Sequence, residues 1–342
     1  MTDRYLITGG AGFIGSNFIR FLLQTRSDCS VINLDKLTYA GNPDNLLDVA
    51  TDPRYRFVKG DIADPEAVDT AMSGGIDFVF NFAAETHVDR SILDPSGFIR
   101  TDVLGVHVLL EASRRIGVRR FIQISTDEVY GSIDEGSFCE TDPVHPSSPY
   151  SASKAGGELL VSSYVTTYGF PAIITRASNN YGPYQYPEKL IPLFVTNAIE
   201  GKNLPVYGDG LNVRDWLYVL DHCEALDFLL RNGQIGGIYN IGGGNERPNI
   251  YITHRILDVL EKPRSMITYV RDRPGHDRRY SIDCGRIEAL GWKPRHDFDE
   301  GLDATIRWYR DHPDWWRKLK GRKEEFEAYY KTWYQDSQGM KS

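Results

Sequence analysis

The chain has 342 residues, of which 41% are hydrophobic and 25% are charged, a composition typical of a globular protein large enough for two fused lobes. Its formal net charge of -8 at pH 7 argues against a general nucleic-acid or membrane-surface binder, because such partners require a broad cationic face. No apolar stretch approaches the roughly 20 residues of a membrane helix, and the N-terminus runs straight into a strand-like segment, so we expect neither export nor anchoring. The cysteines lack CxxC and Cys/His spacing, which predicts free thiols in a reducing cytoplasm and no metal site.

Short β-rich runs alternate with helical patterns in the first half of the chain. We expect strands at residues 5–8, 31–35, 57–59, 78–82, 121–125 and 172–175. This alternation predicts an α/β fold with a Rossmann-like, doubly wound parallel sheet.

Beyond about Asn179 the alternation weakens, because prolines and glycines divide the chain into short pieces before an aromatic-rich helical tail from about Leu302. We therefore predict a Rossmann domain over residues 1–178 and a smaller mixed α/β lobe over residues 179–342. Strand-like pieces near residues 214–219 and 238–242 are expected to return to the main sheet. The aromatic side chains of the tail are expected to pack within the lobe rather than to form a partner site.

A glycine-rich turn follows the first expected strand, with Gly9, Gly12 and Gly15 at a spacing typical of dinucleotide-binding proteins. Because glycines lack side chains, the backbone can approach a pyrophosphate, whose charge is stabilised at the positive end of the following helix. Asp35 ends the second expected strand, where a carboxylate typically binds the ribose hydroxyls. The pattern predicts a dinucleotide site that prefers NAD to NADP, a preference that the neighbouring Lys36 weakens slightly.

Tyr150 and Lys154 form a YxxxK pair, and this spacing places both side chains on one face of a helix. A phenol with a reference pKa of about 10 is a poor base at neutral pH, so a nearby ammonium group is useful because it favours tyrosinate. The pair alone is common by chance and indicates oxidation chemistry only in a suitable context.

A second polar cluster, which includes Thr126, Asp127 and Glu128, lies at the carboxyl end of an expected strand, where open α/β sheets bind ligands. An isolated Asp-Glu pair is more often a solvated turn. Beside Tyr150 and Lys154, however, a hydroxyl and two carboxyl groups suit a dehydration that proceeds through a temporary ketone. A simple dehydrogenase would not require both carboxyl groups.

Together these motifs resemble those of the extended short-chain dehydrogenases, and specifically the dTDP-glucose 4,6-dehydratases. The resemblance runs from Tyr5 to about Trp308 and includes residues 34–42, 87–91, 178–185 and 273–280. Two features depart from the family pattern: Thr86 stands where serine is usual, and Gly156 and Gly157 stand where bulkier residues are common. Thr86 keeps the hydroxyl, and we expect the glycines to permit close packing at a subunit contact.

The resemblance implies a lyase that converts dTDP-glucose to dTDP-4-keto-6-deoxyglucose and water, with NAD regenerated in each turnover. Tyr150 would remove the proton of the 4-hydroxyl group, assisted by Thr126 and Lys154, while hydride leaves carbon 4. Glu128 would then remove the carbon-5 proton and Asp127 would protonate the departing 6-hydroxyl group, before hydride returns to carbon 6.

The resemblance also implies the residues that bind each ligand. For NAD these are Gly9, Gly12, Phe13, Ile14, Gly15, Asp35, Lys36, Leu37, Thr38, Asp61, Ile62, Phe82, Ala83, Ala84, Thr86, Thr101, Tyr150, Lys154 and Asn180. For the nucleotide sugar they are Thr86, Thr126, Asn179, Lys189, Leu190, Pro205, Val206, Tyr207, Arg214, Asn249, Arg273 and His276. Without the resemblance, Arg214 would be assigned to a salt bridge with Asp215 and His276 to an ordinary loop.

Other functions stay open on the sequence alone. UDP-glucose is an alternative substrate for the same reaction, since thymine and uracil differ by one methyl group, worth about 1–3 kcal/mol in a pocket. A UDP-sugar 4-epimerase or decarboxylase would share Tyr150 and Lys154 but lack the adjacent carboxyl pair, and a non-catalytic NAD-binding sensor would have lost these residues. The resemblance further implies a homodimer that forms through helices near residues 96–116 and 148–168.

Overall fold

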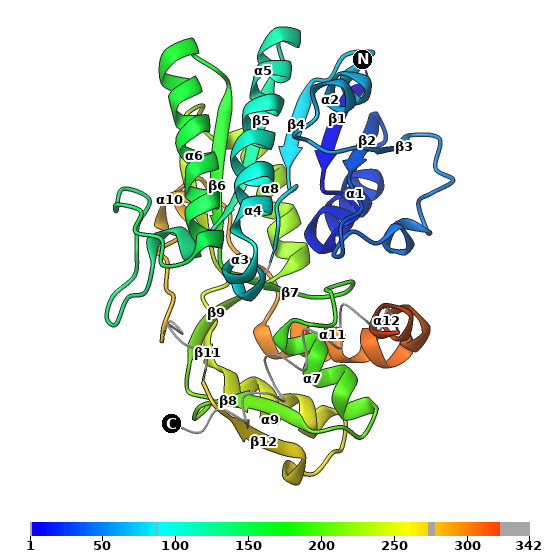
Figure 1. The fold of residues 1–342 in the computed structure, drawn as a ribbon, viewed down its shortest axis with the longest axis vertical. Helices are drawn as coiled ribbons and strands as arrows, with labels where there is room; N and C mark the ends of the chain where they lie inside the picture. Colours follow the sequence, from blue (N-terminus) through cyan, green and yellow to red (C-terminus); the bar gives the residue numbers. More distant parts are fainter. Residues whose placement is uncertain (1, 87, 273–277, 322–342) are drawn as a thin grey trace.

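The computed structural model describes residues 2–86, 88–272 and 278–321. A parallel sheet with helices on both faces forms the larger part, and a smaller lobe lies at one end of this sheet (Figure 1). The seven main strands pair in the order β10-β6-β5-β4-β1-β2-β3, and every pairing is parallel. Their bounds are β1 (Asp3–Thr8), β2 (Cys29–Asp35), β3 (Tyr55–Lys59), β4 (Phe78–Asn81), β5 (Arg120–Thr126), β6 (Ala172–Ala177) and β10 (Ile238–Ile241).

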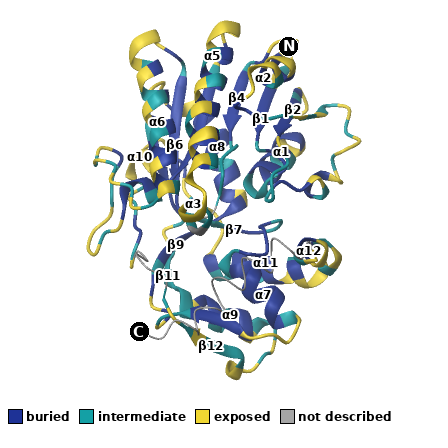
Figure 2. Ribbon diagram, in the orientation of Figure 1, coloured by how far each residue is buried: buried dark blue, intermediate teal, exposed yellow. Residues whose placement is uncertain are grey.

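Two apolar cores hold the helices against the sheet. On one face, Ile7 of β1 packs in a buried cluster with side chains of α1 (Phe13–Thr25) and α8 (Val219–Asn232). On the other face, Leu6 packs with α2 (Pro65–Met72), α5 (Val106–Ile116) and α6 (Pro149–Tyr168). Consecutive residues of a strand point to opposite faces, so a sheet covered on both sides requires the nearly continuous apolar runs seen in the sequence. Figure 2 shows these buried strands between helices whose outer surfaces are exposed.

The six strands predicted from the first half of the sequence are confirmed, and residues 238–242 return to the main sheet as β10, which pairs with β6. The expected return of residues 214–219 is wrong. β9 (Val213–Tyr218) instead lies between β7 (Asn179–Tyr181) and β11 (Glu246–Pro248) in a separate sheet. β10 occupies the side of β6 that β5 leaves open, and β9 takes its hydrogen-bond partners from β7 and β11 instead.

The smaller lobe has its own core, built around a two-stranded parallel sheet of β8 (Leu204–Tyr207) and β12 (Ile267–Val270). Its helices are α7 (Leu190–Ile199), α9 (Asn249–Val259), α11 (Phe298–Asp311) and α12 (Pro313–Lys320). Tyr309 and Trp316 of the tail are fully buried in this core, and Trp315 donates a hydrogen bond of 2.9 Å to Asn45 Oδ1. The prediction that the tail packs is therefore confirmed up to residue 321, and its remainder lies outside the described residues.

Short elements complete the chain. They are α3 (Val88–Leu93), α4 (Pro95–Ile99), α10 (Gly285–Ala289), the 3-10 helices η1 (Pro43–Leu46), η3 (Asp127–Tyr130) and η4 (Arg264–Met266), and the π-helix η2 (Arg100–Gly105). The cysteines are free thiols. Within the part of the chain that the structure describes, no helix is both long and apolar enough to cross a membrane.

The two glycines that follow Lys154 lie where α6 meets η2. A Cβ atom added at Gly157 would lie 2.5 Å from the carbonyl oxygen of Asp102, and one added at Gly156 would lie 3.1 Å from Val103 Cγ2. Within the chain, these glycines permit a close approach to η2, and the subunit contact predicted from the sequence stays a prediction. Glycine is required at residue 157 because its neighbour is backbone, which cannot rotate away.

Gly157→Ala is expected to lower the free energy of unfolding by about 1–3 kcal/mol, because the new methyl group would overlap the Asp102 carbonyl and push α6 from η2. Gly156→Ala is the matched control, since its neighbour is a side-chain methyl group and alanine favours a helix by about 1 kcal/mol over glycine. Thermal denaturation of both variants tests this difference, and equal melting temperatures would contradict it.

Candidate active site

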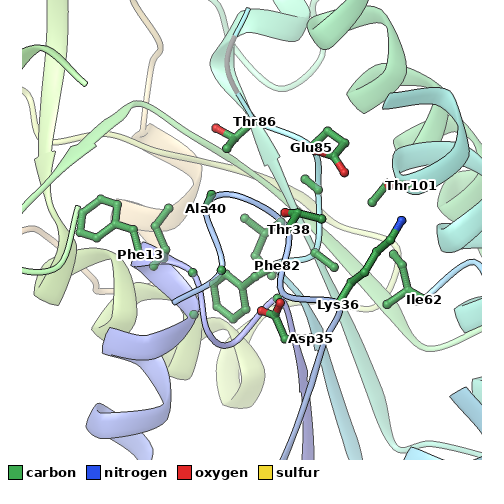
Figure 3. Close-up of a pocket in the computed structure, with 18 of the residues that line it drawn as sticks. Phe13, Asp35, Lys36, Thr38, Ala40, Ile62, Phe82, Glu85, Thr86 and Thr101 are labelled. Carbon is green, nitrogen blue, oxygen red and sulfur yellow. The ribbon is translucent and has the colours of Figure 1, made fainter. Parts of the chain in front are cut away.

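A pocket lies at the carboxyl ends of the central strands, and Figure 3 shows side chains that line it. The predicted NAD residues in its wall are Gly9, Gly12, Phe13, Ile14, Gly15, Asp35, Lys36, Thr38, Asp61, Ile62, Phe82, Ala83, Ala84, Thr86, Thr101, Tyr150 and Lys154. Leu37 and Asn180 stand outside this lining. The Leu37 amide donates to Asp35, and Asn180 Oδ1 lies 2.9 Å from the Nδ1 atom of the buried His222. Residues far apart in the sequence are thus brought to one site.

The glycine turn forms one end of this pocket. Gly9 has a φ of 66°, and a Cβ atom there would lie 2.7 Å from the backbone nitrogen of Ala83. Gly12 is the N-cap of α1 and provides no side-chain cap, so the backbone amides of the first helical turn are available to an anion. The turn therefore offers the cradle that a pyrophosphate requires.

Asp35 shapes the adjacent wall. Its Oδ2 atom accepts a hydrogen bond of 2.9 Å from the Ala11 amide and its Oδ1 atom one of 2.8 Å from the Leu37 amide. Burial raises the pKa of the Asp35 carboxyl group, and these two hydrogen bonds oppose that rise. Each carboxylate oxygen can accept a further hydrogen bond, which suits a ribose diol.

Lys36 lies next to this carboxylate, and its Nζ atom forms an ion pair of 2.9 Å with Asp61 Oδ2. The ion pair balances the lysine charge, so Lys36 favours a 2′-phosphate less than the sequence alone suggests. The glycine cradle and the buried Asp35 fit NAD.

Asp127, at the start of η3, is the predicted acid and lies in an unusual environment. Thr126 Oγ1 donates a hydrogen bond of 3.2 Å to Asp127 Oδ1 and accepts one of 3.3 Å from the Glu128 amide. Asp127 is 3% exposed, and its Oδ2 atom has no hydrogen-bond partner among the described residues. Burial, together with the charges of Glu128 and Asp215, raises the pKa of Asp127 to about 8. Asp127 is therefore mostly protonated at neutral pH and can act as an acid.

Tyr150 and Lys154 lie on α6, whose start is set by a capping box between Ser148 and Ser151. The buried Lys154 ammonium group donates a hydrogen bond of 2.8 Å to the Ile124 carbonyl oxygen of β5, which holds α6 against this strand. Burial lowers the pKa of Lys154. Desolvation and nearby carboxylates, Glu128 first, raise the pKa of Tyr150 well above its usual value, while a hydrogen bond with Thr126 opposes this rise.

Comparisons with known proteins agree with this geometry. A family described as GDP-mannose 4,6 dehydratase matches residues 6–305. The chain is 51% identical to a dTDP-glucose 4,6-dehydratase of Streptomyces niveus, covering 94% of this chain and 97% of the relative. It is 53% identical to the low-salt glycan biosynthesis protein Agl12 of Haloferax volcanii, covering 89% and 97%. The crystal structure of DesIV, a dTDP-glucose 4,6-dehydratase of Streptomyces venezuelae with NAD bound, superposes with a TM-score of 0.90 at 52% identity, covering 93% of this chain and all of that one.

The chain belongs to the dTDP-glucose 4,6-dehydratase family. It is an NAD-dependent nucleotide-sugar 4,6-dehydratase with the extended short-chain dehydrogenase fold. A UDP-glucose 4-epimerase of Thermotoga maritima shares the fold, with a TM-score of 0.84, but only 30% of the sequence over 90% of this chain and 99% of that one.

A further buried carboxyl group lies beside the helix that carries Tyr150 and Lys154, and the sequence did not predict it. Asp102 of η2 is 2% exposed, and its Oδ2 atom accepts a hydrogen bond of 2.6 Å from Ser153 Oγ, next to Lys154. Its Oδ1 atom accepts one of 3.3 Å from the Glu85 amide. Burial raises the pKa of Asp102 to about 6, and the positive charge of Lys154 opposes this rise. No motif indicates Asp102, because its proximity to α6 arises only when η2 packs on that helix.

The predicted substrate residues divide between the pocket and the lobe. Thr86 and Lys189 line the pocket, Thr126 is the last residue of β5, and Asn179 is the first residue of β7. The others that the structure describes lie on lobe elements: Leu190 on α7, Pro205, Val206 and Tyr207 on β8, Arg214 on β9 and Asn249 on α9. Arg273 and His276 lie outside the described residues.

Arg214 and Asp215 do not share one environment. The Arg214 guanidinium group lies 4.4 Å from the ring centre of Tyr280, whereas the Asp215 carboxylate accepts hydrogen bonds of 2.8 and 2.6 Å from the amides of Gly243 and Asn245. Consecutive residues of a strand point to opposite faces, which separates the two side chains.

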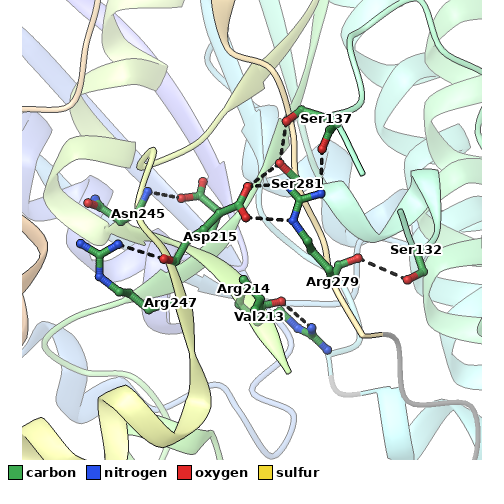
Figure 4. A network of polar contacts seen from close by, with 11 residues as sticks. Ser132, Ser137, Val213, Arg214, Asp215, Asn245, Arg247, Arg279 and Ser281 are labelled. Atoms are coloured by element: carbon green, nitrogen blue, oxygen red, sulfur yellow. Dashed lines mark hydrogen bonds and ion pairs between the residues drawn. The ribbon is translucent and has the colours of Figure 1, made fainter. Parts of the chain in front are cut away.

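A polar network joins the lobe to the segment that follows η3 (Figure 4). Arg279 pairs with Glu246 of β11 through two hydrogen bonds of 2.9 and 2.8 Å and donates a third, of 2.7 Å, to the Gly136 carbonyl oxygen. Ser281 donates to the same Glu246 carboxylate and lies 2.7 Å from Ser137 Oγ. The network therefore fixes the loop after Asp127 and Glu128 relative to the sheet that carries Arg214.

Proposed function

We propose that the protein converts dTDP-glucose to dTDP-4-keto-6-deoxyglucose and water. The observation that supports this function is the position of the buried Asp127, whose pKa burial raises, and of its neighbour Glu128 beside the Tyr150 and Lys154 pair. An epimerase or a decarboxylase does not require an acid and a base for water loss. A sensor without turnover does not require any of these four residues.

In the oxidation step, Tyr150 removes the proton of the sugar 4-hydroxyl group, and Thr126 donates a hydrogen bond to that oxygen. When bound, NAD accepts the hydride of carbon 4, returns it later to carbon 6, and carries a positive charge that favours the tyrosinate form of Tyr150. Lys154 holds α6 against β5 through its hydrogen bond to the Ile124 carbonyl oxygen, which fixes the helix that carries Tyr150.

In the elimination step, the new ketone at carbon 4 acidifies the hydrogen at carbon 5. Glu128 removes this proton as the base, and Asp127 donates its own proton to the departing 6-hydroxyl group. The carbon–oxygen bond at carbon 6 breaks and one water molecule leaves. Two neighbouring carboxyl groups can divide these roles because burial keeps Asp127 protonated.

We assign the diphosphate to Arg214 and Lys189, since cations in a confined site bind phosphate oxygens through charge-assisted hydrogen bonds. The named substrate of the Streptomyces niveus relative favours a thymidine nucleotide. UDP-glucose is the nearest alternative, because the bases differ by one methyl group.

The test is to incubate the purified protein with dTDP-glucose and, separately, with UDP-glucose, without added NAD. The mass of the product and its absorbance in alkali report the 4-keto-6-deoxy sugar. We expect preferred turnover of dTDP-glucose. Glu128→Gln keeps the side-chain shape but removes the base, so this variant should form no deoxy product. Preference for UDP-glucose would overturn the nucleotide assignment, and failure of both sugars with NAD supplied would overturn the reaction.

Loss of water is expected to slow as pH rises through about 8. Asp127 must be protonated to act as the acid, and burial raises its pKa to about 8, so its active form predominates below that pH and is lost above it. The rate of elimination should then fall about tenfold per pH unit. Mass spectrometry of quenched reactions should show the nucleotide 4-ketoglucose, which still retains the elements of water, accumulating at pH 9 but not at pH 7. Equal partition at the two pH values would contradict the role of Asp127.

We also propose that the protein is a cytoplasmic homodimer that forms through the helical segments near residues 96–116, which include α4, η2 and α5, and near residues 148–168, which form α6. This assignment is supported by large apolar side chains on α4, η2 and α6 that are exposed in the isolated chain, among them Ile99 at 58%, Leu104 at 44% and Leu159 at 63%. Free cysteines suit a reducing compartment.

Light scattering at micromolar protein is expected to give twice the mass of one chain. Leu159→Glu should lower that mass, because it places a charge on the apolar face of α6. A wild-type mass of one chain would contradict the dimer.

A further inference from the structure

Three segments meet beside the cofactor pocket: the loop after β2, the start of α3 and the loop before α7. Tyr39, from the first loop, places its hydroxyl oxygen 2.9 Å from the Thr86 carbonyl oxygen and 3.0 Å from Glu188 Oε1. Tyr39 therefore bridges the exit of β4 and the loop that enters the smaller lobe.

Arg90 of α3 strengthens this bridge. Its guanidinium carbon lies 3.6 Å from the ring centre of Tyr39, and its Nη2 atom lies 3.6 Å from Glu188 Oε2. Glu188 is only 3% exposed, so its carboxyl group is withdrawn from water and depends on these partners. Tyr186 packs edge-on against Tyr39, with 5.6 Å between ring centres.

The two loops that Tyr39 joins both contribute to the pocket wall. Thr38 and Ala40, the neighbours of Tyr39, line the pocket (Figure 3), and so do Tyr186 and Glu188. A dinucleotide held by the glycine turn and Asp35 would thus lie between the two loops that Tyr39 and Glu188 join.

We propose that Tyr39, Arg90 and Glu188 form a clasp that retains NAD in its pocket throughout turnover. The clasp rests on the NAD-dependent reaction proposed above. It assigns a positioning role to three residues that make no part of the acid and base chemistry.

Retention matters because the reaction first oxidises and then reduces the same sugar. If the cofactor left between these steps, the sugar would remain a 4-ketoglucose nucleotide. The protein would then lack the NAD that oxidises the next substrate. The clasp must therefore open more slowly than the chemistry proceeds.

The protonation states of Tyr39 and Glu188 suit the retention of NAD. Burial raises the pKa of Tyr39 well above its usual value, so its hydroxyl group keeps its hydrogen. A phenol donates one hydrogen bond at a time, to Thr86 or to Glu188. Burial also raises the pKa of Glu188, while the charges of Lys189 and Arg90 oppose this rise.

The test uses the holoprotein loaded with isotopically labelled NAD and chased with excess unlabelled NAD. Tyr39→Phe keeps the ring and its contacts with Arg90 and Tyr186 but removes the hydroxyl bridge. We expect the label to leave this variant about tenfold faster than the wild type, as the loss of one buried hydrogen bond implies. Tyr251→Phe is the matched control, because it removes a tyrosine–carboxylate hydrogen bond to Asp299 far from the pocket lining, and its exchange rate should stay within twofold of the wild type.

Glu188→Gln provides a second, independent variant, since it keeps the side-chain shape and removes the charge that faces Arg90. It should also release the label faster, and it decides the outcome where Tyr39→Phe does not fold. Release from both variants within twofold of the wild type would overturn the clasp. The exchange needs no sugar substrate, so a failure of the dehydration assay would leave this result interpretable.

Without added NAD, Tyr39→Phe should complete about tenfold fewer turnovers than the wild type before activity stops, and added NAD should restore its activity.

Discussion

The approach of α6 to η2 is the constraint on which the active site depends. Because residue 157 has no side chain, the helix can lie against the Asp102 carbonyl oxygen, where a Cβ atom would be only 2.5 Å away. This approach brings Ser153 to the Asp102 carboxylate and lets Lys154 reach the Ile124 carbonyl oxygen of β5. Tyr150 is carried on the same helix and so lies beside Thr126 at the end of β5. The geometry of oxidation is thus set by backbone packing before any ligand binds.

Electrostatics then divide the chemical roles. Asp102, Asp127 and Glu128 all influence the pKa of Tyr150, and in the protein alone these carboxyl groups favour the neutral phenol. Burial makes Asp127 a proton donor near neutral pH, whereas Asp102 loses its proton more readily because Lys154 lies close to it. Groups of one chemical kind therefore differ in function because their surroundings differ.

Much of this site could be predicted from the sequence. Strands buried on both faces require long apolar runs, and the glycine turn and the YxxxK spacing are local patterns, so Gly9, Asp35, Tyr150 and Lys154 could be found without a fold. Asp102 could not, because its importance arises from contact with a helix that begins 47 residues later in the chain. The error over β9 has a related cause: a short strand-like run shows that a strand forms, but its partner depends on which sheet edges other segments already occupy.

The two parts of the molecule are joined on more than one side of the reacting groups. Arg279 and Glu246 connect β11 to the loop after the catalytic carboxyl groups, and Tyr39 and Glu188 connect the cofactor loop to the entry of the smaller lobe. At the tail, Trp315 reaches Asn45 beyond the same cofactor loop. Each of these links is a hydrogen bond between segments far apart in the sequence, so each forms only when both parts are folded. The loops beside the cofactor pocket are therefore held in part by the smaller lobe, so the shape of the pocket depends on the folding of both parts.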